Sequence, residues 1–181
     1  SLKAGTTSAG ENGGEILIES GKTTGGSGTG GVMNLNAGQS QAVVGGYFSV
    51  SAGQGGTIGG KIKLVAGVGD SNTGGMISLL SGPGTSTTSG QIQIRSPDAG
   101  TKGVSGALVF SSGITTCGAS GSISIGTGTA AIGEGGDVFV SVGDSNHQPG
   151  GMMSLKAGTT SAGANGGEIL IESGKTTGSS G

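Results

Sequence analysis

The chain has 181 residues, of which 46 are glycine, 2% are aromatic and 10% are charged. Glycine is therefore about a quarter of the chain, against an average near 7% in soluble proteins. The formal net charge of -2 gives no basic surface for nucleic acid or for anionic lipid. No apolar run approaches the roughly 18 residues of a membrane helix, and glycine does not recur at every third position as collagen requires. Nucleic-acid binding, membrane insertion and a collagen fold are thus all disfavoured.

The two ends of the sequence and its one cysteine say little about where the chain works. Cys117 has no second cysteine with which to form an internal disulfide, so it does not identify a redox compartment. The first residues, SLKAG, correspond to the end of a repeat unit, and Gly181 falls inside another. The sequence therefore predicts a segment of a longer repetitive chain.

A seven-position unit, x-apolar-x-apolar-x-small-Gly, recurs along the whole chain with a period of about 15 residues. One or two glycines precede each complete unit. Gly59–Gly67, GGKIKLVAG, shows the pattern clearly. The complete units begin at Glu15, Val32, Tyr47, Lys61, Met76, Gln91, Ala107, Ser122, Asp137, Met152 and Glu168.

The alternation in each unit is typical of a short β-strand with positions two and four buried. The Ser-, Thr- and Gly-rich stretch between units often contains one apolar residue, as at Val44, Ile58, Val104 and Ile132. That residue suggests a second, weaker strand returning across a thin core. Two such strands and two turns use up about 15 residues. The sequence thus predicts an all-β fold without helices, a narrow two-sheet parallel β-solenoid of about 12 coils of ~15 residues.

A longer repeat lies over the short one. Residues 1–28 recur at 154–181 with two changes, Glu11 to Ala164 and Gly26 to Ser179. The shift is ten units, and a looser five-unit repeat relates about 32–106 to 107–181. If successive units ran up and down as an antiparallel meander, a shift by five units would match up-strands with down-strands. If each unit is one full coil, all units are equivalent and any shift is allowed. The sequence therefore predicts one continuous segment over 1–181, with one coil per unit.

Several outward-facing positions of the units are apolar. Scattered exposed apolar residues are normal, but a lateral interface with sister chains or another protein is the alternative. The candidates for that interface are Leu17, Tyr47, Val65, Met76, Leu80, Val109, Phe139, Met152 and Leu170. The open ends of a solenoid are unpaired sheet edges, so end-to-end self-association is expected as well.

No combination of residues indicates catalysis or metal binding. His147, the one histidine, lies in the turn-like sequence DSNHQPGG without a recognisable nucleophile or orienting acid. Cys117 is interpreted as a small filler residue, and Asp70 and Asp144 as turn formers rather than calcium ligands. The stretch Gly133–Val140, GEGGDVFV, matches a calcium-binding nonapeptide once, where tandem copies are needed. No catalytic residue, cofactor or metal site is therefore predicted.

The repeat pattern resembles three groups of proteins. Over the whole chain, the GGxIxLxAG units are similar to those of Gly/Ser/Thr-rich secreted repeat proteins of algae and other protists. The stretch Thr129–Gly136, TAAIGEGG, resembles the heads of trimeric bacterial adhesins. The period and the threonine pairs resemble flat ice-binding rolls; the pairs are Thr6-Thr7, Thr23-Thr24, Thr115-Thr116 and Thr159-Thr160.

The first resemblance implies an extracellular fibre or a surface appendage. The predicted function is accordingly a structural, non-enzymatic protein that self-associates end to end and laterally, with other filament proteins or glycans as further partners. The alternatives are an adhesin shaft or receptor-binding module, and an ice-binding roll.

Overall fold

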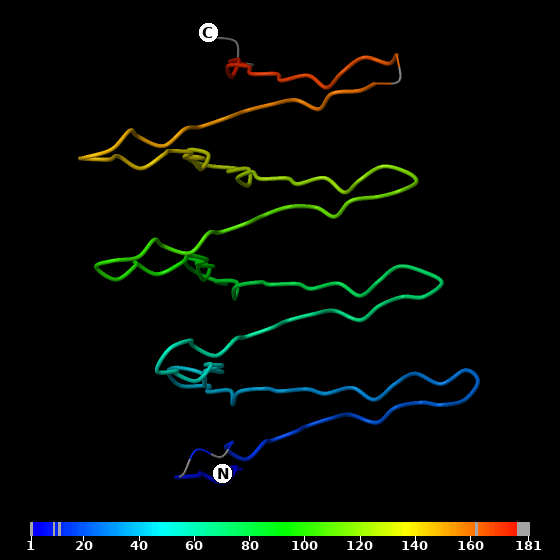
Figure 1. Cartoon of the computed structure of the whole chain (residues 1–181). Coiled ribbons are helices and arrows are strands. Elements are labelled where there is room, and N and C mark those ends of the chain that lie inside the picture. Colours follow the sequence, from blue (N-terminus) through cyan, green and yellow to red (C-terminus); the bar gives the residue numbers. More distant parts are fainter. Residues whose placement is uncertain (1, 9, 11, 162, 177–181) are drawn as a thin grey trace. The chain divides into compact units, whose positions relative to one another are not determined.

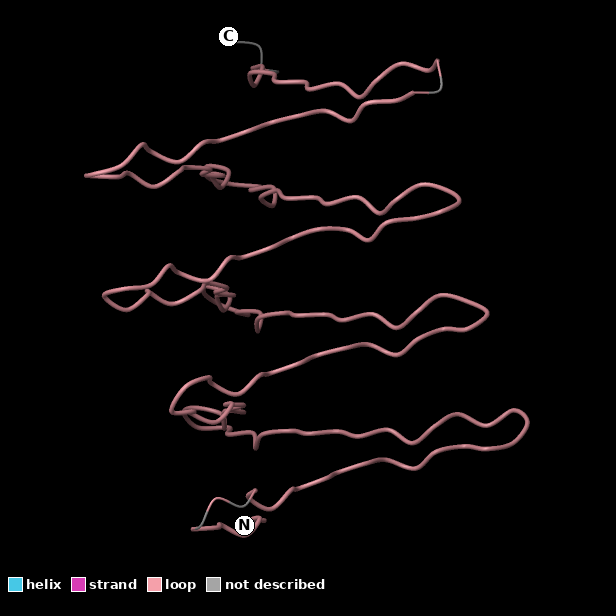
Figure 2. Cartoon of the chain, in the orientation of Figure 1, coloured by secondary structure: helices cyan, strands magenta, loops and turns pink. Residues whose placement is uncertain are grey.

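The computed structural model describes residues 2–8, 10, 12–161 and 163–176, and among these it contains no helix and no β-strand. The described chain consists of extended stretches, bends and turns, and all of it is coloured as loop in Figure 2. The predicted parallel β-solenoid is therefore wrong. The last residues of the long repeat, 177–181, lie outside the described part.

The chain divides into two units, Ser1–Ile92 and Gln93–Gly181. Within each unit, extended stretches alternate with loops that turn the chain back on itself (Figure 1). The loops carry the Ser-, Thr- and Gly-rich sequences, and the extended stretches carry the apolar alternation. Both units therefore follow one local plan.

Most loops in the first unit are closed at the base by a hydrogen bond between two glycines. The amide of Gly75, just before one repeat, donates to the carbonyl of Gly67, the seventh position of the preceding repeat, over 2.9 Å. The same bond recurs with distances of 2.8–3.0 Å. Its other pairs in the first unit are Gly14 to Gly5, Gly31 to Gly21, Gly46 to Gly38, Gly60 to Gly53 and Gly90 to Gly82, and in the second unit Gly167 donates to Gly158.

A hydroxyl at the sixth position makes a related contact in two loops of the second unit. Ser96 Oγ donates to the carbonyl of Gly106 over 2.8 Å, where proline occupies the seventh position. Thr127 Oγ1 donates to the carbonyl of Gly136 over 3.1 Å. In the first unit Ser20 Oγ adds such a bond, to Gly31, beside the backbone closure. In these loops the base is thus held by a backbone bond, a side-chain bond or both.

Close packing at the loop base explains why glycine precedes each unit and a small residue fills position six. A Cβ added to Gly75 would lie 3.2 Å from the Cβ of Ala66 and 3.2 Å from the amide nitrogen of Gly67. A Cβ on Gly67 itself would meet nothing within 4 Å. The glycine before the unit is therefore needed for close approach, and the seventh-position glycine is not.

The stretch between successive closures has a constant length. It is six residues in every case in the first unit: 15–20, 32–37, 47–52, 61–66 and 76–81. The loops vary instead, since the closing glycines are 7 positions apart at Gly53 and Gly60 but 10 apart at Gly21 and Gly31. We call these stretches, and 107–112, 122–127, 137–142, 152–157 and 168–173 in the second unit, the six-residue segments.

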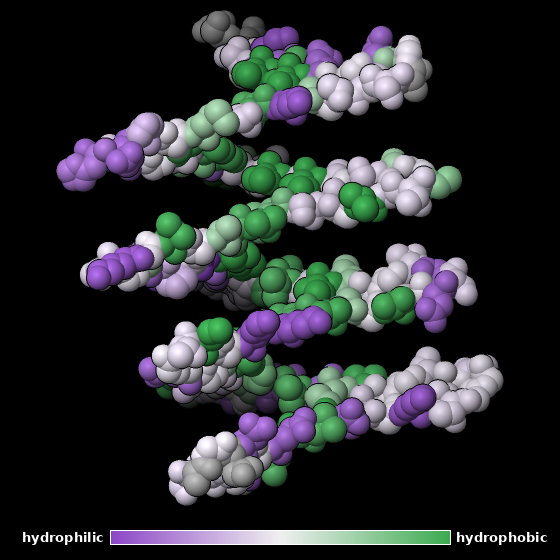
Figure 3. All heavy atoms as spheres, viewed as in Figure 1, coloured by the Kyte–Doolittle hydropathy of each residue, from purple (hydrophilic) through white to green (hydrophobic). Residues whose placement is uncertain are grey.

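The six-residue segments do not enclose a core. No described residue is a buried apolar residue, and the second-position side chains are 44–63% exposed. Figure 3 shows green, apolar atoms on the surface in view, with pale and purple atoms at the outer ends of the loops. The prediction that positions two and four are buried is wrong.

The loop closure explains why a solenoid does not form. One coil per unit would require residue 76, the start of one repeat, to lie over residue 61, the start of the previous repeat. The Gly75–Gly67 bond instead places residue 76 beside the end of segment 61–66. The expected returning strand is absent as well: Val44, Ile58, Val104 and Ile132 are 79–99% exposed. The loop therefore returns to its own base rather than crossing a core.

Candidate functional site

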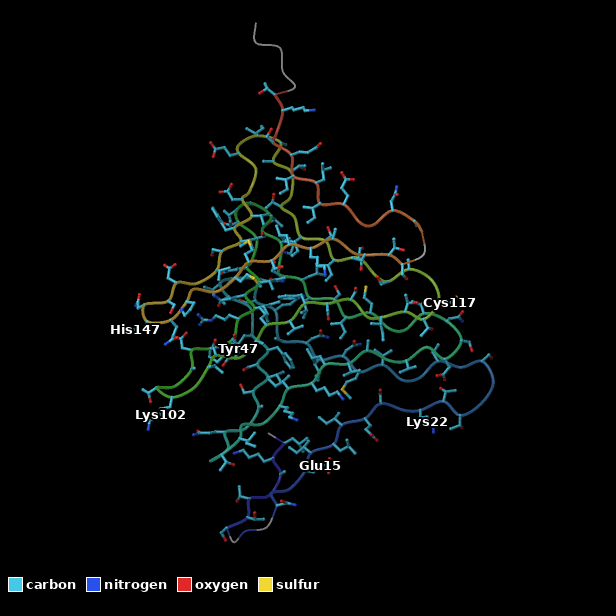
Figure 4. All side chains as sticks on the ribbon, turned by 45° about the horizontal axis from the view of Figure 1, so that its top comes forward. Glu15, Lys22, Tyr47, Lys102, Cys117 and His147 are labelled. Atoms are coloured by element: carbon cyan, nitrogen blue, oxygen red, sulfur yellow. The ribbon has the colours of Figure 1, made fainter. Side chains whose placement is uncertain are left out.

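The residues with catalytic or metal-binding chemistry lie apart, on loops. Figure 4 shows Lys102 and His147 at the tips of loops that point to the same side of the second unit, with Cys117 pointing elsewhere. Cys117 is a free, exposed thiol. The structure therefore does not combine histidine and cysteine in one site.

Local hydrogen bonds shape these loops. The backbone amide of Gln148 donates a hydrogen bond to Ser145 Oγ over 3.1 Å, which closes the bend around His147. Thr115 Oγ1 donates to the carbonyl of Cys117 over 3.0 Å. The following Gly118 has a φ of 106°, a conformation that other residues rarely adopt. The chain bends at both tips, and for His147 this agrees with the turn-like sequence around it.

Neither a pocket nor a metal site is found in the part of the chain that the structure describes. No pocket is present there. No three His, Cys, Asp or Glu side chains in the described ranges gather closely enough to hold a metal ion, and this includes Asp70, Asp144 and the GEGGDVFV stretch. The described residues also contain no helix suited to crossing a bilayer.

The threonine pairs occupy loops rather than one flat face. Thr23 Oγ1 donates to the carbonyl of Thr29 over 2.7 Å, and Thr115 Oγ1 bonds within its own turn. These hydroxyls are used to hold loop geometry. An ice-binding face needs regularly spaced, outward-facing threonines, and these two are already engaged.

The six-residue segments of both units share one surface chemistry. Each carries apolar side chains at positions two and four, and the lateral-interface candidates are 69–89% exposed at their odd positions. Among the latter, Tyr47 is marked in Figure 4. Their exposure leaves them accessible to a partner, and the interface itself stays a prediction.

The backbone of the six-residue segments is also unpaired. Leaving aside Thr7 and Thr160, the hydrogen bonds of the described residues join positions at most 11 apart, as from Ser20 to Gly31. The amides and carbonyls of residues 61–65 take part in none of these bonds. Each segment thus offers an apolar face and a free backbone edge together.

The sequence showed the glycine pairs and the small sixth residue, but not that they contact each other. The signal was available, because a glycine precedes every complete unit and the sixth residue is small in nearly all of them, as at Gly75 and Ala66. Loop lengths that vary between constant segments also indicated where the closures lie.

No family model, curated protein or solved structure matches the chain.

Proposed function

We propose that the chain is a structural protein that self-associates into an extracellular filament or surface appendage. The observation that carries the proposal is the repeated six-residue segment whose apolar side chains are exposed in every unit. Contiguous exposed apolar surface in a soluble chain marks an interaction site. Because the surface repeats along the chain, the interaction extends along it too.

Three further features support a structural role over an enzymatic one. His147 and Cys117 stand on separate loops in Figure 4, and no pocket gathers other groups in the described ranges. The net charge of -2 gives little repulsion between copies, and a charge near zero favours association. The resemblance of the units to secreted protist repeat proteins supports the extracellular location.

Electron microscopy with sedimentation analysis tests this function. The 181-residue chain is expected to form elongated particles or filaments as its concentration rises. Discrete monomers at every accessible concentration would contradict the proposal. Reproducible binding of such monomers to a surface receptor or to ice would instead support the adhesin or ice-binding alternative.

A further inference from the structure

We infer that the partner of the six-residue segments is a second copy of this chain, docked along the segments through backbone hydrogen bonds and apolar contacts. The inference rests on the proposed self-association and identifies its contact surface. It differs from the solenoid predicted from the sequence, since the pairing joins separate chains. Thr7 and Thr160 aside, no hydrogen bond joins successive segments of one chain among the described residues.

The exposed area of the chain indicates how large a surface is available for contact with a partner. A compact folded monomer of 16.8 kDa exposes about 7,700 Å², and its fully unfolded chain about 24,000 Å². This chain exposes 18188 Å². The excess over a compact monomer is roughly 10,500 Å², several times the ~1,600 Å² of a standard interface. Contact with a partner must therefore run along the chain rather than cover one patch.

The free backbone edges indicate the kind of contact. Segment 61–66 is held at one end by the Gly60–Gly53 bond and at the other by the Gly75–Gly67 bond. Between these bonds its amides and carbonyls are unpaired among the described residues. An extended stretch with free edges binds another extended stretch by strand addition. The closures fix both ends, which lowers the ordering cost of docking.

The repeat identifies a second copy as the occupant. An unrelated peptide would match one segment, whereas a copy supplies segments of the same six-residue length along its whole course. The constant length of the segments beside variable loops is expected if the segments pair and the loops do not. Within the first unit, blue to green in Figure 1, successive turns lie apart, and none of the hydrogen bonds above joins them. The edges of the segments are therefore accessible to another chain.

The polar residues of the segments are compatible with this docking. Lys61 and Lys63 share a segment with Ile62 and Leu64, and no ion pair engages them among the described residues. Long basic side chains keep their charge in water while their alkyl stems cover apolar surface. Docking of a copy can thus bury the isoleucine and leucine without burying the two ammonium groups.

A matched set of aspartate variants tests the inference in the full 181-residue chain. The double variant Ile62→Asp with Leu64→Asp places carboxylates on a segment, and Ile58→Asp places one on the neighbouring loop. Because an unpaired carboxylate is costly to bury, the double variant should raise the concentration needed for association by about tenfold or more. Ile58→Asp should change it less than twofold. The chain has no core among its described residues, so the segment variant removes no core packing.

Amide hydrogen exchange of the unsubstituted chain, dilute and assembled, provides the independent readout. Protection that appears on assembly in the six-residue segments, and not in the loops, is the expected result. Assemblies protected in their loops alone, or equally weakened by Ile58→Asp, would overturn the docking surface and leave the structural function standing. A chain that stays monomeric throughout would overturn both.

Discussion

At the scale of single residues, the two glycines of a loop closure have different roles. Gly75 approaches Ala66 and the backbone of Gly67 closely, while Gly67 has open space around its own Cα. The chain therefore uses glycine once for close packing and once where a side chain would fit. The sixth-position residue is small for the same reason as Gly75.

We expect Gly75→Ala to open the loop base and Gly67→Ala to leave it closed. The added methyl at position 75 would lie at 3.2 Å from two atoms, so the Gly75–Gly67 hydrogen bond must lengthen. Loss of one such bond destabilises the closed loop by about 1 kcal/mol. The amide of residue 75 should therefore exchange with solvent about fivefold faster. Exchange measured by NMR in the dilute chain checks this. Equal effects of the two substitutions would show that close packing is not the reason why residue 75 is glycine.

A second residue-scale prediction concerns the side-chain closure at Pro97. Ser96→Ala removes the hydroxyl that donates to the carbonyl of Gly106. Because that loop has no glycine–glycine bond at its base, its opening should become easier by about 1 kcal/mol. Limited proteolysis after Lys102, at the loop tip, measures the opening. Ser20→Ala is the control, since the Gly31–Gly21 bond still closes its loop and cleavage after Lys22 should hardly change.

At the scale of elements, the variable parts of the chain are the loops and the constant parts are the segments. Successive repeats begin 14 residues apart at Tyr47 and Lys61, but 17 residues apart at Glu15 and Val32. The loops absorb that whole difference, because closure entropy changes slowly with loop length. A segment cannot absorb it, since one extra residue reverses which side chains share a face.

Insertions should therefore have opposite outcomes in the two kinds of element. Two glycines added after Ser40, in the loop closed by Gly38 and Gly46, should leave self-association within about twofold. One alanine added after Lys63 exchanges the faces of the residues that follow it in the segment, and should weaken self-association about as much as the aspartate pair. Sedimentation velocity over a concentration series compares the two. Similar losses in both would show that loop length matters as well.

At the scale of the whole molecule, none of the described apolar residues is buried, so self-association should depend strongly on temperature and salt. Apolar burial weakens on cooling and is strengthened by sulfate. Association driven by the segments should thus fall between 37 and 5 °C, about tenfold in affinity, and should rise in sulfate more than in chloride of equal ionic strength. Light scattering measures both. Association that strengthens on cooling, or follows ionic strength alone, would point to polar or charged contacts instead.

A spectroscopic change should accompany association. The described residues of the single chain contain no strand and no helix, whereas backbone pairing between copies creates strands. The far-UV circular dichroism of the full chain should therefore gain strand character as concentration rises, in parallel with sedimentation. Assembly without that gain would mean that side chains alone make the contact.

The amino-acid sequence by itself determined the repeat, the alternation within each segment and which stretches between segments have loop composition. Glycine, serine and threonine place the loops, and Ile62 and Leu64 show which face of a segment is apolar. Those are local properties, and local sequence is enough to predict them. The absence of a catalytic site was likewise an expectation from composition, and it stays one.

The tertiary structure alone decided what each segment lies beside. Alternation predicts an apolar face but not its partner, so the expectation that Ile62 faces a core within the same chain is wrong. The closure between Gly67 and Gly75 depends on contact across a loop, which no five-residue pattern reveals. In the loops that close, that contact sets the end of one segment beside the start of the next, and the apolar side chains of the segments stay exposed.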